Sequence, residues 1–546
     1  MKDKEEEDPV DLIFKDASMC SKYVIFMFLS LGFLAAYSGC VFTYVFLARD
    51  VKYRCLIEEC EPSPTDTIYE PKWLKHLVPY TGSVPDSCHR YALRNDSCST
   101  EATSGNNETF RCNKFVYQTK DVTLVHDFDL NCDENAWKLT MVGTISMTGE
   151  LVCLAYTGFI SDKYGRKTLL IASTLMSTVV GVIKSFSVSY NMYVFLEFVD
   201  SIFGAAMYYG AFILAMEFVA PRNRNIVNIV ICSLYAFGGC YMGIIAWLFP
   251  YWRTMLRVLY FPRFICILFF WTVPESIRWL LSKNKISSIH NIVSRVKGLK
   301  DKEDPNLTKL LDAYYEAQTQ LCAENTTVAS EKFIDAIKHK SLLLRFVICC
   351  FIWVTVNFIY YGLTLNSVDL TDDIYLSFIV SCLIEIPGYI IYYVVNEKIG
   401  RRLLTSVTFI LAGLACLAVG FIPQDIQWLR LSLYLVGKCS STVTYTVIFI
   451  YTTEMFPTTC RHSMLSICGM MGRLGSLIAP QIPLMARVSE MLPLVLFAIM
   501  GSISGTLALL FPETLNTKLP QTIQEAINIG KRDKRNARRD SAPPES

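Results

Sequence analysis

Twelve long apolar runs divide this 546-residue chain, and each can cross the roughly 30 Å hydrocarbon core of a bilayer as a helix. The first six runs lie at 23–48, 138–158, 168–187, 192–216, 226–249 and 256–273. The second six lie at 342–364, 374–395, 403–422, 428–451, 463–486 and 491–511. Hydrocarbon offers the backbone no hydrogen-bond partners, so runs of this length must satisfy their own backbone groups as helices. We therefore expect an all-α membrane protein with 12 transmembrane helices in two six-helix bundles.

The chain carries the same charged motifs twice, in the same order. Asp162-Lys-Tyr-Gly-Arg166, after the second run, returns as Glu397-Lys-Ile-Gly-Arg401 after the eighth. The other repeated motifs are Glu217 with Arg224, which return as Glu454 with Arg461, and Pro274-Glu275, which returns as Pro512-Glu513. The offsets are 235, 237 and 238 residues. This nearly constant spacing predicts two copies of one membrane unit.

Lysine and arginine placement predicts the orientation of the chain. Basic residues gather in the segments after the even-numbered runs, as in cytoplasmic loops, so both termini are expected in the cytoplasm. The overall charge of +2 carries no such information. The expected segments are an N-terminus at 1–22, helix one at 23–48, an outer loop at 49–136, helices two to six at 137–274, a cytoplasmic linker of short amphipathic helices at 275–340, helices seven to twelve at 341–511 and a basic tail at 512–546.

The polar loop after the first run has the features of an extracellular domain. It contains six cysteines, Cys55, Cys60, Cys88, Cys98, Cys112 and Cys132. An even number in an oxidising compartment predicts three disulfides, with the pairing left open. Asn95 and Asn107 begin glycosylation sequons in the same loop. The remaining cysteines are scattered through the apolar runs and are interpreted as packing residues. No spacing of Cys and His predicts a metal site.

Several motifs resemble one family of membrane transporters. They are Pro274-Glu-Ser-Ile-Arg-Trp-Leu280, Tyr451-Thr-Thr-Glu-Met-Phe-Pro457, Gly472-Arg-Leu-Gly-Ser-Leu-Ile-Ala-Pro480 and Pro512-Glu-Thr-Leu-Asn516. With the repeated charged motifs and the long cysteine-bearing loop, they resemble the organic cation, anion and carnitine transporter family (solute carrier family 22) of the major facilitator superfamily. The resemblance implies alternating access, in which two six-helix bundles rock around a central site that opens to one side at a time.

In this scheme the repeated charges form a cytoplasmic gate. One half contributes Asp162, Arg166, Glu217, Arg224, Glu275 and Arg278, and the other contributes Glu397, Arg401, Glu454, Arg461 and Glu513. We expect salt bridges between the halves that close the cytoplasmic side in the outward-open state. The alternative is that these charges are solvated loop residues that follow the positive-inside rule.

Two charged residues within the apolar runs are the main candidates for substrate binding. Glu385 lies in Ile384-Glu-Ile-Pro-Gly388, where cation and carnitine members resemble this chain in carrying a glutamate. It is expected to face a substrate ammonium, or else to pair with Lys438 or Arg473. Arg473 stands where cation-selective members have aspartate and where anion and carnitine members have arginine. Its guanidinium suits a carboxylate, with packing against Glu385 or a backbone carbonyl as the alternative. Together the two residues predict a pocket for a zwitterion.

Further candidates are acidic or aromatic. Glu150, Glu197 and Asp200 make the first half unusually acidic. Glu150 and Asp200 are predicted to face the cavity and attract amines. Glu150 is also a candidate proton carrier. Glu197 could face the cavity as well, and the alternative is that it lies at the outer end of its helix in contact with solvent. The aromatic candidates for the cavity wall are Trp353, Tyr360, Tyr361, Tyr208 and Tyr445. Ring faces attract ammonium groups by about 0.5–2 kcal/mol each, although aromatic rings in membrane helices also serve as packing residues.

These observations predict a multi-pass plasma-membrane carrier for small organic cations or zwitterions, such as carnitine-like or amine metabolites. The alternatives are an organic anion carrier that uses Arg473 and a non-transporting receptor that uses the outer loop. Sodium or proton coupling is left open. We expect no enzyme activity, cofactor or nucleic-acid partner, because the sequence has no phosphate-binding loop, nucleophile constellation or metal spacing.

Overall fold

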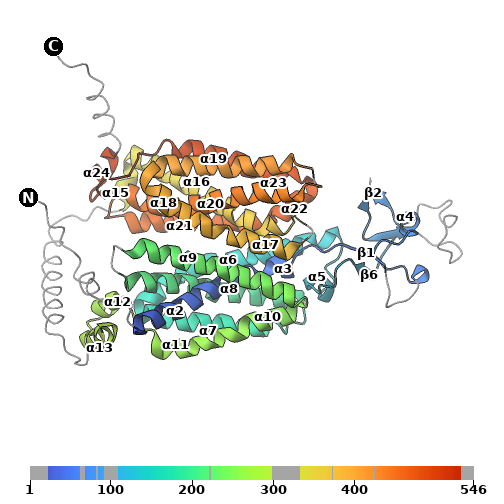
Figure 1. The fold of residues 1–546 in the computed structure, drawn as a ribbon, viewed down its shortest axis with the longest axis horizontal. Helices are drawn as coiled ribbons and strands as arrows, with labels where there is room; N and C mark the ends of the chain where they lie inside the picture. Colours follow the sequence, from blue (N-terminus) through green and yellow to red (C-terminus); the bar gives the residue numbers. More distant parts are fainter. Residues whose placement is uncertain are drawn as a thin grey trace, which may run out of the picture.

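The computed structural model describes residues 22–61, 68–81, 84–91, 109–219, 223–297, 333–369, 371, 373–423 and 425–529. Two groups of long helices lie side by side along a common axis (Figure 1). The first group contains α2 (Lys22–Ser38) with η1 (Gly39–Thr43) and α3 (Tyr44–Leu47), α6 (Ala136–Tyr164), α7 (Arg166–Lys184), α8 (Tyr190–Glu217), α9 (Arg224–Leu248), and α10 (Trp252–Tyr260) with η5 (Phe261–Ile265) and α11 (Cys266–Thr272). The second contains α16 (Lys340–Leu365), α17 (Ile374–Leu383) with α18 (Glu385–Ile399), α19 (Arg401–Gly420), α20 (Gln427–Met455), α21 (Arg461–Ile478) with η7 (Ala479–Gln481) and α22 (Ile482–Val488), and α23 (Met491–Ala508).

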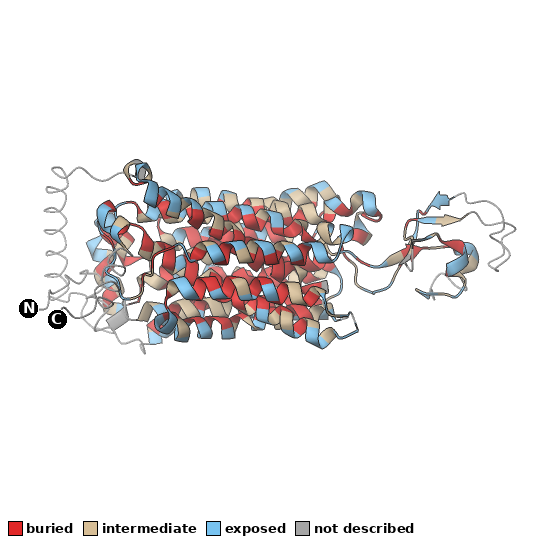
Figure 2. Cartoon of the chain, turned by 90° about the horizontal axis from the view of Figure 1, so that it is seen from above, coloured by how far each residue is buried: buried red, intermediate tan, exposed pale blue. Residues whose placement is uncertain are grey.

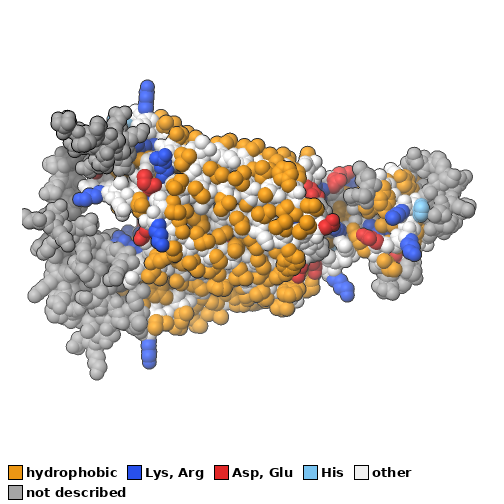
Figure 3. Space-filling view, turned by 45° about the horizontal axis from the view of Figure 1, so that its top comes forward, with side chains coloured by type: hydrophobic (Ala, Val, Ile, Leu, Met, Phe, Trp, Pro, Cys, Tyr) orange, Lys and Arg blue, Asp and Glu red, His pale blue; other side chains and the backbone are white. Residues whose placement is uncertain are grey.

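Eleven of the described helical spans are long and apolar enough to cross a membrane. The remaining predicted run, 463–486, is the eleventh in chain order and folds as α21, η7 and α22, with interruptions at Pro480 and Pro483. Proline has no N–H to continue the helical ladder, which accounts for the break. Hydrophobic side chains cover the visible flank of the bundle, and charged side chains gather at its two ends (Figure 3). The predicted all-α fold with two six-helix bundles is therefore confirmed.

The two ends of the bundle differ, and we name each by what it carries. Gly165, which lies against Glu275, and its counterpart Gly400, which lies against Glu513, mark the hinge end. This end also carries the first described residues of α2 and four short helices (Figure 1). These helices are α12 (Ile277–Ser282), α13 (Ile286–Lys297), α15 (Phe333–Lys338) and α24 (Ile523–Asn528). The first three of them lie in the segment predicted to be an amphipathic linker. The loop-domain end carries the segment between α3 and α6, which projects beyond the bundle.

The described part of the loop domain is built on small antiparallel pairs. β1 (Tyr53–Cys55) pairs with β6 (Phe115–Tyr117), β2 (Tyr80–Thr81) with β3 (Val84–Pro85), and β4 (His89–Tyr91) with β5 (Thr109–Arg111). Its helical turns are η2 (Glu58–Cys60), α4 (Leu74–Leu77), α5 (Leu124–Asp127) and η3 (Asp133–Asn135). Disulfides join Cys55 to Cys112 and Cys88 to Cys132, and Cys60 is also disulfide-bonded. The predicted positions Cys98, Asn95 and Asn107 lie outside the described residues.

Buried residues line the interior of the bundle along its length, and exposed residues lie on its outer surface (Figure 2). The largest described cluster of buried apolar residues includes side chains from both halves, among them Met147 of α6 and Phe358 of α16. Polar side chains also lie within this interior, so we next describe where the candidate residues are placed.

Candidate functional site

The repeated motifs at the hinge end build the same arrangement in each half. Gly165 (φ +102°) precedes α7, and the Glu275 carboxylate accepts a hydrogen bond from the Lys167 backbone N–H at 2.9 Å. Gly400 (φ +90°) precedes α19, and Glu513 accepts from the Arg401 backbone N–H at 3.0 Å. Free N–H groups and the helix dipole favour a carboxylate at this position. Glu275 and Glu513 therefore cap helices within their own halves.

Three ion pairs between described residues at this end also stay within a half. Arg166 lies 3.1 Å from Asp162 and 3.7 Å from Glu217, measured between charged atoms. In the second half, Arg401 lies 3.2 Å from Glu454. The remaining predicted gate residues are also at the hinge end: Arg224, Arg278 and Arg461 are half-buried, and Glu397 is exposed.

The gate was predicted for the outward-open state, so the pairing in this conformation leaves it a prediction. We expected these charges to pair across the halves, whereas Asp162, Arg166, Glu217, Arg401 and Glu454 pair inside them. The physical reason is that the halves meet at the opposite end. There the Gln481 amide donates to the Thr144 hydroxyl at 2.7 Å and accepts from Thr140 at 3.0 Å. Further contacts of this kind join Arg487 to Asp133 and Asp50, and Tyr375 to Asp121.

Arg473 lies between the two halves, at the centre of the bundle. One guanidinium nitrogen is 2.7 Å from the Glu150 carboxylate and donates to the Tyr361 hydroxyl at 2.8 Å. Another donates to the Tyr209 hydroxyl. Glu150 and Tyr209 come from α6 and α8, and Tyr361 and Arg473 come from α16 and α21, so each half supplies two groups. Both charged residues are buried, with exposures of 5% for Glu150 and 7% for Arg473.

The partner of Arg473 differs from the two alternatives considered from sequence. It is Glu150, which was predicted to face the cavity, and not Glu385 or a backbone carbonyl. Tyr209 was not predicted as part of the site, although its neighbour Tyr208 was. Within a helix, adjacent residues point about 100° apart, and nothing in the sequence indicates which of the two tyrosines faces the second half.

Glu385 forms a second, separate ion pair. Its carboxylate lies 2.8 Å from the Lys438 ammonium and accepts hydrogen bonds from the Tyr360 and Tyr389 hydroxyls. All four residues belong to the second half. The helix is interrupted at Ile384, where α17 ends at Leu383 and α18 begins at Glu385. Pro387 accounts for the break, because its ring clashes with the carbonyl four residues earlier. The structure thus shows the alternative in which Glu385 pairs with Lys438.

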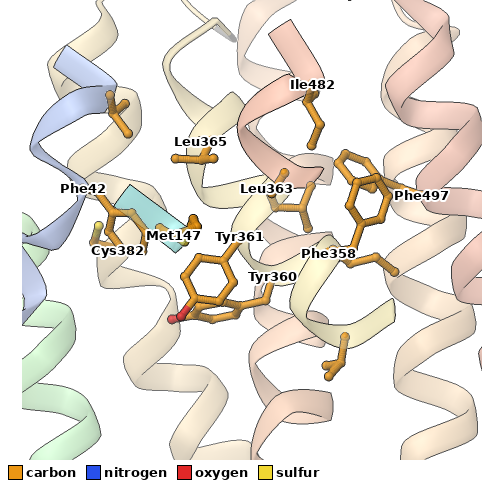
Figure 4. Packing of buried hydrophobic residues seen from close by; sticks show 14 of the residues in the cluster. Phe42, Met147, Phe358, Tyr360, Tyr361, Leu363, Leu365, Cys382, Ile482 and Phe497 are labelled. Carbon is orange, nitrogen blue, oxygen red and sulfur yellow. The ribbon is translucent and has the colours of Figure 1, made fainter. Parts of the chain in front are cut away.

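Aromatic side chains connect the two ion pairs. Tyr360 and Tyr361 project from α16 on the side of Phe42, Met147 and Cys382 (Figure 4). The rings of Tyr360 and Tyr361 are 5.4 Å apart between centroids, and one hydroxyl reaches Glu385 while the other reaches Arg473. The pair on α16 therefore forms one continuous polar and aromatic surface.

The other predicted aromatic residues border this surface. Tyr445 lies 5.1 Å from Tyr360 and 6.5 Å from Trp353, between ring centroids. Trp353 donates its indole N–H to Thr452 at 3.0 Å, within the second half. On the other side, Tyr208 packs 5.2 Å from Tyr235. The structure brings most of the predicted aromatic set to the middle of the bundle.

Asp200 lies apart from the Arg473 centre and lines a separate cavity of the first half with Glu197, Tyr260 and Arg263, so its role in substrate binding stays a prediction. It and Glu197 both bind the buried ammonium of Lys184, at 2.6 and 2.8 Å. Asp200 also accepts hydrogen bonds from Ser177 and Tyr260. All five residues belong to the first half, where one ammonium faces two carboxylates and the buried Arg263 guanidinium lies 4.4 Å from the Tyr260 ring centroid. Lys184 was not among the predicted residues: it lies near the end of the third apolar run, where a lysine side chain can extend to the membrane surface. Glu197 is buried, so its predicted solvated alternative is wrong.

The comparisons with known proteins agree with this architecture. Residues 94–524 match the model of the "Sugar (and other) transporter" family. Solute carrier family 22 member 2 of Pongo abelii is 30% identical over 76% of this chain and 73% of its own length. The "Organic cation transporter protein" of Drosophila melanogaster is 27% identical over 89% of both chains. A partially occluded inward-open structure of the xylose transporter XylE from E. coli has a TM-score of 0.60 at 15% identity, over 90% of this chain and 100% of that one.

These matches define the class of protein as a multi-pass membrane transporter with the major facilitator fold. The chain belongs to the sugar (and other) transporter family and, within it, to solute carrier family 22.

Proposed function

We propose that this protein carries small organic cations or zwitterions, such as carnitine-like or amine metabolites, across the plasma membrane by alternating access. The observation that carries the proposal is the buried Glu150–Arg473 pair, which joins the halves at the centre of the bundle and is bordered by tyrosines. A charged group in that place needs a functional reason, because burial in the membrane is costly for each charge. The name of the Drosophila relative supports organic cations as part of the substrate range.

The residues of the centre suit the two ends of such a substrate. The Arg473 fork is shaped for a carboxylate. The tyrosine rings of the α16 surface offer the faces that attract an ammonium group. Glu385 is neutralised by Lys438 at 2.8 Å, so it acts by holding Tyr360 in place and not as a free counter-charge.

The driving force follows from the charge of the substrate. A monovalent cation gains about 2.3 kcal/mol per 100 mV of membrane potential, whereas a net-neutral zwitterion gains nothing from it. A zwitterion therefore needs a downhill gradient or a coupled sodium ion or proton. Uptake that is unchanged when sodium is replaced by lithium and when the pH is altered would exclude both forms of coupling.

The experiment uses three radiolabelled probes and cells that express the full-length chain. The probes are γ-butyrobetaine (a trimethylammonium carboxylate), propyltrimethylammonium (which lacks the carboxylate) and hippurate (a monovalent aromatic carboxylate). Saturable uptake of either of the first two, absent from mock cells, supports the proposal. Uptake of hippurate alone points to an organic anion carrier. Uptake of none of the three contradicts transport of these classes and favours a receptor. The variant Arg473→Ala is expected to lower the uptake of γ-butyrobetaine relative to that of propyltrimethylammonium.

A further inference from the structure

The Glu150–Arg473 pair differs from the other buried ion pairs in the bundle because it crosses between the halves. Glu150 lies on α6 and Arg473 on α21. The pairs of Lys184 and Lys438 each lie inside one half, so they move as parts of one body. In a carrier whose halves rock against each other, a pair that joins the halves is the one that opens and closes during the cycle.

We infer that Glu150 is a built-in substitute for the substrate and that the carrier exchanges this ion pair for a zwitterion. In the empty protein, the Glu150 carboxylate occupies Arg473. When a zwitterion enters, its carboxylate takes the place of Glu150 at Arg473, and its ammonium takes the place of Arg473 at Glu150. This inference rests on the proposed function, and it assigns the ammonium to Glu150 in place of Glu385.

Charge balance in the buried centre makes this exchange selective. A zwitterion replaces one neutral pair by two neutral pairs, so every buried charge keeps a partner. A monovalent cation at Glu150 leaves Arg473 without one, and a monovalent anion at Arg473 does the same to Glu150. A buried charge that loses its partner is strongly unfavourable. Glu150 is thus a specificity-determining residue that favours net-neutral substrates.

The same pair explains how the unloaded carrier returns. With Glu150 on Arg473, the centre is neutral without any substrate, and the halves close around it as they do in this structure. Net transport then requires no second substrate on the return step. Without Glu150, the return step leaves the Arg473 charge alone in the closed centre. The carrier then crosses more readily when a bound carboxylate neutralises Arg473.

The test compares the wild type with Glu150→Gln in liposomes that contain the purified full-length protein. We expect the variant's uptake of γ-butyrobetaine relative to hippurate to fall about a hundredfold, as for a buried charge pair that has lost one partner. We also expect hippurate exchange across the membrane to exceed net hippurate uptake in the variant. Glu150→Asp, which keeps the charge, is expected to recover part of the wild-type ratio.

Two further variants distinguish a change in substrate specificity from a loss of folded protein. Glu197→Gln removes another buried carboxylate of the first half, and Lys184 keeps Asp200 as its partner. We expect it to alter the amount of folded protein without altering the probe ratios. The double variant Glu150→Gln with Arg473→Gln contains no unpartnered charge, so it folds if the single variant does not. It is expected to carry γ-butyrobetaine and propyltrimethylammonium at similar rates.

The outcomes separate this inference from the proposed function. If the wild type moves neither γ-butyrobetaine nor propyltrimethylammonium, the proposed function fails and the inference fails with it. If the wild type moves γ-butyrobetaine and Glu150→Gln keeps the same probe ratios, the proposed function stands and the inference is overturned. If the double variant still prefers the zwitterion, the inference is likewise overturned.

Discussion

Buried cations in this protein take their roles from the position of their partners. Lys184 binds carboxylates of the first half, Lys438 binds a carboxylate of the second half, and Arg473 binds across the two. Pairs inside one half can stabilise that half throughout a transport cycle. The Arg473 pair joins the two halves, so it forms or breaks when the halves move. All three residues are buried cations that pair with carboxylates. The half in which the carboxylate lies decides whether the ion pair stays formed or breaks during transport.

The Lys184 cluster makes the first prediction. Replacement by methionine leaves Glu197 and Asp200 buried without their shared cation. We expect Lys184→Met to lower the free energy of unfolding by about 3–5 kcal/mol, as for other buried pairs that lose one member. Thermal unfolding of the purified protein in detergent measures the change.

The control for this prediction removes the charges together. The triple variant Lys184→Met, Glu197→Gln, Asp200→Asn removes the three paired charges and leaves only Arg263 charged beside this cavity, so its melting temperature should recover part of the loss. A Lys184→Met protein as stable as the wild type would show that the cluster is hydrated in solution and contributes little.

At the scale of the helices, the two repeats share one device for starting a helix. A glycine with positive φ precedes α7 and α19, and a glutamate from the following Pro-Glu motif accepts hydrogen bonds from the first turn. A Cβ on Gly165 would lie 2.2 Å from a Glu275 carboxylate oxygen, and one on Gly400 would lie 2.6 Å from Glu513. The repeated sequence motif therefore has a structural function in each half besides any function at the hinge end.

The second prediction concerns this helix start. Gly165→Ala places a side chain in a backbone region that is nearly restricted to glycine, and it pushes against Glu275. We expect it to destabilise the protein by about 1–3 kcal/mol, measured as a lower melting temperature in detergent. Gly158 offers a matched control seven residues earlier on α6, because a Cβ there meets no atom within 4 Å. Equal melting temperatures for Gly165→Ala and Gly158→Ala would contradict this account.

The sequence predicts the helices well and their interruptions less well. Apolar length located the spans, because a bilayer sets that length directly. The breaks after Leu383 and Ile478 follow from Pro387 and Pro480, and those prolines are visible in the sequence. Proline within a membrane helix is often tolerated, however, so its presence alone did not predict where each helix ends.

The sequence predicts which charged residues belong to the candidate site, but it does not predict which residues pair with each other. Glu150, Glu385 and Arg473 could be selected because a charge inside an apolar run needs a reason. The partner of each charge depends on how helices far apart in the sequence are rotated and packed. Lys438 was one of several possible partners for Glu385, and Tyr209 differs from Tyr208 only by a rotation about α8. Those choices are made by tertiary packing.

At the scale of the whole molecule, the two halves meet closely where α9 faces α17. The Cys240 thiol of the first half donates to the Ile379 carbonyl of α17 at 3.6 Å, and Cys382 lies three residues further along α17; both cysteines are buried and free. A native pair of thiols thus spans the interface between the halves in this conformation. If the halves rock apart here during transport, the two sulfur atoms separate in the other state.

The third prediction uses this pair to test the rocking motion. Copper phenanthroline is expected to oxidise the two thiols to a disulfide, with two protons and two electrons lost to the oxidant, and to stop uptake until dithiothreitol reduces the bond. Cys240→Ser should make uptake resistant to the oxidant. Cys468→Ser removes a thiol that lies 3.7 Å from Cys350 within the second half, so this control should stay sensitive. Continued uptake by a carrier shown by mass spectrometry to contain the Cys240–Cys382 bond would mean that the halves do not separate at this interface, and alternating access would need another pivot.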